Sequence, residues 1–196
     1  MSDCGCDIEV KNREQSRVLI LLLLINFGMF LFEIVFGLIA QSTALIADSL
    51  DMLADATVYA IAWVAVGRSV SLKIKAARVS GLLQITLGLM VLSDVVRRFF
   101  IGSEPQSLIM FAIGTLALLA NIICLGLIAK HRQGEVHMRA SWIFSKNDVI
   151  ANLGILLAAG LVYLFESNWP DLLVGAVVAI VVIRGGIQIL RESNNP

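Results

Sequence analysis

Charged residues are scarce in this chain of 196 residues: Asp, Glu, Lys and Arg together make up only 15% of it. A soluble domain of this size carries about a quarter charged residues. Hydrophobic residues make up 58% of the sequence, and they come in long blocks without the alternating or amphipathic pattern of a soluble fold. The composition therefore excludes an ordinary soluble domain and predicts an integral membrane protein.

The sequence also has no basic patch with interleaved aromatic residues, and its formal net charge is zero. The net charge says little, but the lack of a basic patch argues against a nucleic-acid partner. There are only three cysteines. Cys124 lies in an apolar block, where we expect it to pack like other small side chains. Cys4 and Cys6 precede the first block, on the side predicted below to be reducing, so no structural disulfide is expected.

Six apolar blocks are each near the roughly 20 residues that a helix needs to cross about 30 Å of hydrocarbon. Backbone groups in lipid must bond within their own segment, so each block is predicted to be a helix. The blocks span residues 18–39, 43–66, 79–100, 107–129, 140–165 and 172–190. We therefore expect an all-α membrane protein with a short tail over residues 1–16, a six-helix domain over 17–193 and no soluble C-terminal domain.

Lys and Arg gather in the segments that would share one side of the bilayer, which should be the cytoplasmic side. These basic residues are Lys11, Arg13, Arg17, Arg68, Lys73, Lys75, Arg78, Lys130, Arg132, Arg139 and Arg191. Both termini are therefore predicted to be cytoplasmic. The opposite side carries Glu104, Glu166 and Asp171, while Arg97 and Arg98 are exceptions to the pattern.

Three aspartates interrupt the second apolar block. Asp51 and Asp55 are four residues apart and share a helix face, and Asp48 lies nearly on that face. An ionised side chain at such a depth costs about 2.5 to 3.5 kcal/mol. Because no Lys or Arg occurs between Val18 and Arg68, Asp51 and Asp55 are predicted to bind a cation. For Asp48, a structural hydrogen bond and a functional role are equally open.

The fifth block carries Asp148, with Asn152 one turn further on the same face. Since the second and fifth helices run in opposite directions, Asp51, Asp55 and Asp148 can meet at a similar depth. Three carboxylates from two helices predict an oxygen-rich site for a divalent cation. Lys146 lies on another side of the fifth helix, and we expect it to reach the membrane surface instead of pairing with an aspartate.

Two further groups leave alternatives open. Glu33 is another acid within an apolar block, and it either faces a water-filled path or bonds within the bundle. Cys4 and Cys6 form a Cys-x-Cys pair that either captures a soft or borderline metal or consists of two ordinary thiols.

These motifs resemble the transmembrane part of the cation diffusion facilitators, or cation efflux family. The resemblance covers about residues 17–191 and is carried by STALIADSLDMLADA, by HMRASWIFSKNDVIAN and by the six-block layout. It implies a multi-pass protein of the cell (inner) membrane that exports a divalent metal from the cytosol, and not an enzyme. It also makes a homodimer a candidate assembly.

In that family the second and fifth helices each supply two metal ligands, four residues apart. Asp51 and Asp55 fit the second-helix pair. In the fifth helix the Arg-Ala pair that begins at Arg139 sets the register, which places Asp148 at the second ligand position and Phe144 at the first. Phenylalanine cannot bind a metal, so the resemblance implies three of the four usual ligands.

The resemblance leaves the fourth ligand open. Water, Asn147 or Asn152 would complete the shell, and a second register would pair Asp148 with Asn152. An all-oxygen shell weakens the preference for zinc and favours harder ions. The cargo is left as zinc, iron, manganese or cobalt, and no cofactor is expected. The alternative function is a transport-deficient relative that acts as a metal sensor or partner subunit.

Overall fold

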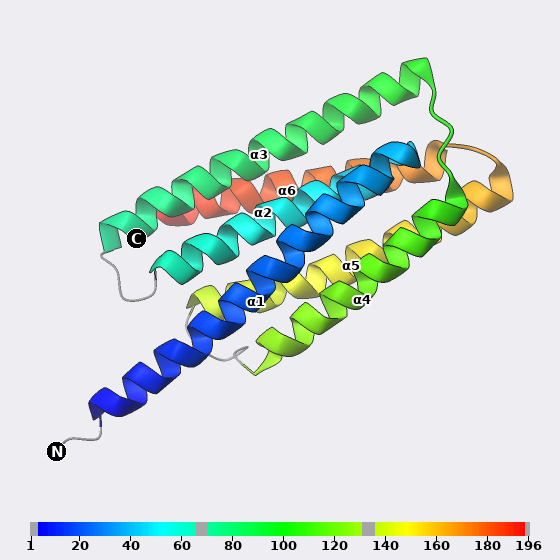
Figure 1. Cartoon of the computed structure of the whole chain (residues 1–196). Coiled ribbons are helices and arrows are strands. Elements are labelled where there is room, and N and C mark those ends of the chain that lie inside the picture. Colours follow the sequence, from blue (N-terminus) through cyan, green and yellow to red (C-terminus); the bar gives the residue numbers. More distant parts are fainter. Residues whose placement is uncertain (1–3, 66–69, 131–135, 195–196) are drawn as a thin grey trace.

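The computed structural model describes residues 4–65, 70–130 and 136–194, and within these ranges it contains six α-helices and no strand. In chain order they are α1 (Cys4–Ile39), α2 (Thr43–Ala65), α3 (Val70–Ile101), α4 (Ser107–Ala129), α5 (Val136–Phe165) and α6 (Trp169–Asn194). All six run roughly along one bundle axis (Figure 1).

Each predicted apolar block lies in one of these helices except for Val66, the last residue of the block 43–66, which lies outside the described residues. The block 107–129 matches α4 residue for residue. The main difference is at helix ends. α1 begins at Cys4 and α3 at Val70, so much of the predicted tail and of the basic loop is helical. Lys, Glu and Arg are good helix formers and extend a helix that already exists at little cost. Hydropathy detects only the apolar part of such a helix.

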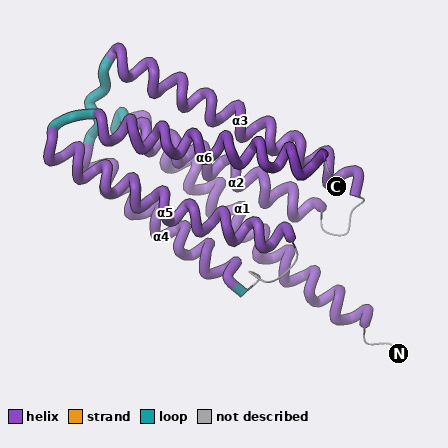
Figure 2. Tube along the Cα trace, turned by 180° about the vertical axis from the view of Figure 1, so that it is seen from behind, coloured by secondary structure: helices purple, strands orange, loops and turns teal. Residues whose placement is uncertain are grey.

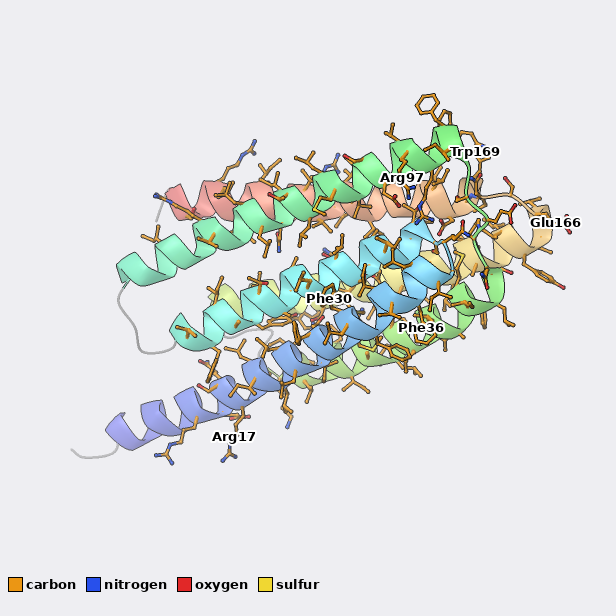
Figure 3. All side chains as sticks on the ribbon, turned by 45° about the horizontal axis from the view of Figure 1, so that its top comes forward. Arg17, Phe30, Phe36, Arg97, Glu166 and Trp169 are labelled. Carbon is orange, nitrogen blue, oxygen red and sulfur yellow. The ribbon has the colours of Figure 1, made fainter. Side chains whose placement is uncertain are left out.

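The connections α1–α2, α3–α4 and α5–α6 lie at one end of the bundle, the hairpin end, which comprises residues 40–42, 102–106 and 166–168. α1 begins and α6 ends toward the other end, the terminal end (Figures 1 and 2). Figure 3 places Arg97, Glu166 and Trp169 at the hairpin end, whereas Arg17 lies toward the start of α1. Each helix therefore runs from one end of the bundle to the other.

The surface is apolar over much of its area. Leu24 is 58% exposed, Phe100 79% and Leu108 82%, which suits lipid better than water. Among the described residues, four stretches are long and apolar enough to cross a membrane: Arg13–Ile39, Ser107–Ala129, Ser145–Phe165 and Trp169–Arg191. α2 and α3 fall outside this set, and they are the helices interrupted by Asp48, Asp51 and Asp55 and by charged residues from Asp94 to Arg98.

α3 packs along α6 at very short range. A Cβ atom added to Gly186 would lie 2.7 Å from the carbonyl oxygen of Gly81, and one added to Gly81 would lie 2.8 Å from that of Gly186. Small residues allow this backbone approach, which is how helices associate where no hydrophobic effect drives them together.

We expect Gly186→Ala to destabilise the α3–α6 pair by about 1 to 3 kcal/mol, because the new methyl group meets backbone that cannot rotate away. The measurement is the unfolding midpoint of the purified protein in detergent. Gly28→Ala is the matched control, since its added methyl group would meet nothing within 4 Å. An equal midpoint for the two variants would contradict the close packing.

The start of α2 is capped by a residue of α6. Asp171 accepts hydrogen bonds from the hydroxyl group of Ser42 at 2.5 Å and from the backbone N–H groups of Thr43 at 2.6 Å and Ala44 at 3.1 Å. Its side chain is fully buried. A carboxylate here satisfies N–H groups that have no partner inside the helix and lies favourably at the positive end of the helix dipole. It therefore fixes where α2 begins relative to α6.

Removing this cap in Asp171→Ala leaves the Ser42 hydroxyl and two buried N–H groups without an acceptor. We expect the free energy of unfolding to fall by about 1 to 3 kcal/mol. Glu104→Ala, which removes an exposed carboxylate at the same end, should leave it unchanged. Both are measured by detergent-induced unfolding, and a loss of stability in Glu104→Ala as large as that in Asp171→Ala would argue against the cap.

The two arginines that depart from the basic-loop pattern share one carboxylate. Asp94 binds Arg97 at 2.6 Å and Arg98 at 2.6 Å. Arg98 is 6% exposed and also donates to the backbone carbonyl group of Gln41. These arginines therefore hold the hairpin end together, which gives a structural reason for basic residues at that position.

Candidate metal centre

The aspartates of α2 lie on the most enclosed helix of the bundle, since α2 contacts every other helix. Asp48 is 1% and Asp55 5% exposed, while Asp51 is half-buried. Asp55 lies next to the middle of α2 (Thr43–Ala65). α2 therefore carries three aspartates spaced by three and four residues, and two of them are buried.

α5 brings Asp148 to these residues. Its carboxyl group lies within hydrogen-bonding range of that of Asp55. It also lines the same cavity as Asp51. The three aspartates predicted to meet are therefore neighbours around Asp148. As the side chains stand, no three His, Cys, Asp or Glu residues among those described are arranged to hold a metal ion.

The cavity between α2, α5 and α6 has a volume of about 470 Å³. Asp51, Asn147 and Asp148 supply its polar groups. Apolar side chains of α5 and α6 line the rest, among them Ile150 and Val174. The space is large enough for several water molecules beside the carboxylates. The cavity therefore leaves room for water beside Asp51 and Asp148.

Tyr59 and Ser145 are polar neighbours of this site that sequence reasoning missed. The hydroxyl group of Tyr59 donates to Asp55 at 3.4 Å and lies 3.2 Å from the hydroxyl oxygen of Ser145. Both side chains are buried. The available signal was spacing, because Tyr59 follows Asp55 by four residues and Ser145 precedes Asp148 by three.

Asp48 and Asn152 bond to each other. The amide nitrogen of Asn152 donates to both carboxyl oxygens of Asp48, at 2.9 Å each, and both residues are buried. Glu33 of α1 also approaches Asp48, and their carboxyl groups lie within hydrogen-bonding range. These three residues lie nearer the hairpin end than Asp51, Asp55 and Asp148.

Of the other predicted residues, some have side chains that the structure describes and some do not. Lys146 is exposed, as expected, and its ammonium group lies over the ring of Trp142 at 6.0 Å from the centroid. Cys124 is buried and accepts a hydrogen bond from the amide of Asn26 at 3.6 Å. The side chains of Cys4, Cys6 and Phe144 lie outside the described residues. Whether they contribute ligands therefore stays a prediction.

Comparison with known proteins finds metal transporters among the relatives of this chain. Residues 19–194 match the family described as the cation efflux transmembrane domain. A cadmium, cobalt and zinc/H(+)-K(+) antiporter of Bacillus velezensis is 24% identical, over 91% of this chain and 61% of the relative. The zinc transporter ZitB of Yersinia pseudotuberculosis is 26% identical, over 82% and 56%. The metal cation efflux system protein CzcD of Cupriavidus metallidurans is 23% identical, over 86% and 57%. The chain spans about three fifths of the length of these curated relatives.

Proposed function

The chain belongs to the cation efflux family, and from this membership we propose that it exports a divalent metal ion from the cytosol through a carboxylate site on α2 and α5. Its relatives are named as transporters of zinc, cadmium and cobalt. The protein is a multi-pass protein of the cell (inner) membrane, and in this proposal all six helices cross it.

The observation that carries the proposal is the meeting of Asp148 with the aspartates of α2. Asp148 approaches Asp55 within hydrogen-bonding range and shares a cavity with Asp51. No Lys or Arg lies between Val18 and Arg68 to neutralise the α2 residues. Carboxylates that touch in a medium of low dielectric repel strongly. A divalent cation removes that repulsion, which is a reason for such residues to lie inside a membrane.

Each residue has a distinct part in the proposed site. Asp51 and Asp148 face the cavity and meet the incoming ion, with Asn147 beside them as a neutral oxygen donor. Asp55 lies deeper, and the hydroxyl group of Tyr59 orients its carboxylate. All of these donors are oxygens, which suits hard and borderline divalent ions. We therefore propose zinc, cobalt, manganese or iron(II) as cargo.

The experiment is metal uptake into proteoliposomes that hold the purified chain, with zinc, cobalt, manganese and iron(II) tested separately. Transport of at least one ion above protein-free vesicles is the expected result, and a pH gradient applied in half of the samples identifies proton coupling. The alternative is a transport-deficient sensor or partner subunit, which Phe144 at a ligand position would favour. If the chain binds metal but transports none of the four ions, the sensor or partner-subunit alternative is correct.

With an even number of crossings, both ends of the chain lie on the same side of the membrane in this proposal. The gathering of basic residues on that side makes it the cytoplasmic one. A membrane-impermeant maleimide should therefore leave Cys4 and Cys6 unlabelled in intact cells and label them after permeabilisation. Glu104→Cys, which introduces a thiol at an exposed position of the hairpin end, is the control and should react in intact cells. Labelling of Cys4 or Cys6 before permeabilisation would overturn the topology.

A further inference from the structure

Glu33 has no place in the proposed central site, yet it is the most enclosed acid of α1. Its side chain is 0% exposed, and neither of its carboxyl oxygens accepts a hydrogen bond from any donor in the described part of the chain. Leaving a buried polar group unpaired costs about 1 to 3 kcal/mol, and more when the group is charged. The position therefore needs either a proton or a bound cation.

Asp48 and Asn152 surround the same position from two other helices. Asp48 is 1% exposed and its carboxyl group lies within hydrogen-bonding range of that of Glu33. Asn152 is 0% exposed, and its amide oxygen has no hydrogen-bond partner. Its amide nitrogen donates to both carboxyl oxygens of Asp48. The group thus offers oxygens from α1, α2 and α5.

The parts of α1, α2 and α5 that carry these oxygens contain no basic residue close in sequence to Glu33, Asp48 or Asn152. Lys and Arg are absent between Val18 and Arg68, and none occurs between Lys146 and Arg184. Lys146 itself is exposed and directed to the ring of Trp142. The two neighbouring carboxyl groups therefore have no counter-charge from these stretches of α1, α2 and α5.

We propose that Glu33, Asp48 and Asn152 form a second cation site that binds one divalent metal ion, separate from the central site. Asp48 precedes Asp51 by three residues and Asp55 by seven, which is about 4.5 Å and about 10 Å along the helix axis. Asn152 follows Asp148 by four residues, in the same direction. The second site therefore lies in line with the first and nearer the hairpin end.

An apolar layer closes this site toward the hairpin end. Ala44, Leu45, Met110 and Ile155 belong to one buried cluster, and all four are 0% exposed. They come from the start of α2, the start of α4 and the second half of α5. An ion held by Glu33 is thus occluded in this conformation. Where the proposed export function holds, the site is the station that an ion occupies after Asp51 and Asp148 and before release.

The test is the number of Mn²⁺ ions bound by the purified full chain in detergent, measured by equilibrium dialysis. Wild type should bind two ions. Glu33→Gln should bind one, because the amide keeps the size of the side chain and can donate to Asp48 in place of an ion. Glu104→Gln, an exposed substitution at the hairpin end, should still bind two. Matching helical content and elution volume exclude misfolding as the cause.

A double variant separates this inference from the proposed function. Asp55→Asn with Asp148→Asn should retain one ion, and adding Glu33→Gln should remove it. If the double variant binds as many ions as wild type while Glu33→Gln loses one, the second site stands and the central site fails. If Glu33→Gln binds the same number of ions as wild type with the same affinity, the Glu33–Asp48 pair holds a proton and the inference is overturned.

Discussion

Replacing Asp51, Asp55 or Asp148 by alanine should each reduce metal flux in proteoliposomes to the level of protein-free vesicles. Asp148 is the carboxylate that α5 adds to the site, because it approaches Asp55 and shares the cavity with Asp51. After the loss of one carboxylate, two carboxylates remain to bind the divalent ion, and the site has few other atoms that can donate electron pairs to it. Removing supporting groups around a metal already costs about 10 to 100-fold in affinity, and loss of a ligand should cost more.

The stability of the same variants distinguishes a transport site from a structural one. Carboxylates without a basic partner repel in the metal-free protein, so removing one should leave its unfolding midpoint unchanged or raise it. Added metal should raise the midpoint of wild type and not that of the variants, because only a protein that binds the ion is stabilised by it. Glu104→Ala controls for the general loss of an acid. Wild-type flux in any of the three variants at equal reconstitution would falsify the central site.

This pattern is the reverse of the one expected at Asp171. That carboxylate accepts three hydrogen bonds at the start of α2, so Asp171→Ala should lower stability with or without metal. Asp171 and the aspartates of the central site thus differ in what surrounds them. Asp171 has donors that fix it in place, whereas Asp51, Asp55 and Asp148 have chiefly one another. Metal-dependent stability is therefore the measurement that tells a cap from a ligand.

The sequence predicts the helices of this fold well. Each apolar block is long enough to cross the bilayer as a helix, and a helix satisfies the backbone hydrogen bonds of the segment within lipid. The sequence also predicts that Asp148 meets the α2 aspartates, since antiparallel helices bring equal depths together. It fails at helix ends such as Cys4, because polar residues extend a helix without any hydropathy signal. Spacing along one helix shows which side chains share a face and says nothing of which helix that face meets.

That limit explains the residues that were missed or left open. Asp171 caps a helix that begins 128 residues earlier, and no local pattern links the two. Glu33 reaches Asp48 because α1 and α2 pack along each other, and the sequence alone left its role open. Tyr59 meets Ser145 across a gap of 86 residues. Such contacts depend on the rotation of each helix about its axis, which only the packed bundle determines.

Phe144→His should give the central site a preference for zinc. Phe144 precedes Asp148 by four residues within α5, so helical spacing places it one turn away on the same face. The resemblance to the cation efflux family implies a metal ligand at this position. An imidazole there would add a nitrogen donor, which suits zinc and other transition metals better than manganese or magnesium. The measurement is zinc and manganese affinity by calorimetry on purified wild type and Phe144→His.

The companion variants make the result specific to the site. Asp148→Ala in the Phe144→His background should abolish the gain in zinc affinity, because the imidazole alone cannot replace the carboxylate that meets Asp55. Flux through Phe144→His should also acquire a pH dependence near neutrality, since histidine must lose its proton to bind the ion. Unchanged zinc affinity in a folded Phe144→His protein would mean that this position does not face the site. The fifth-helix register would then shift to Asp148 with Asn152, and the role assigned to Asp148 would have to be revised with it.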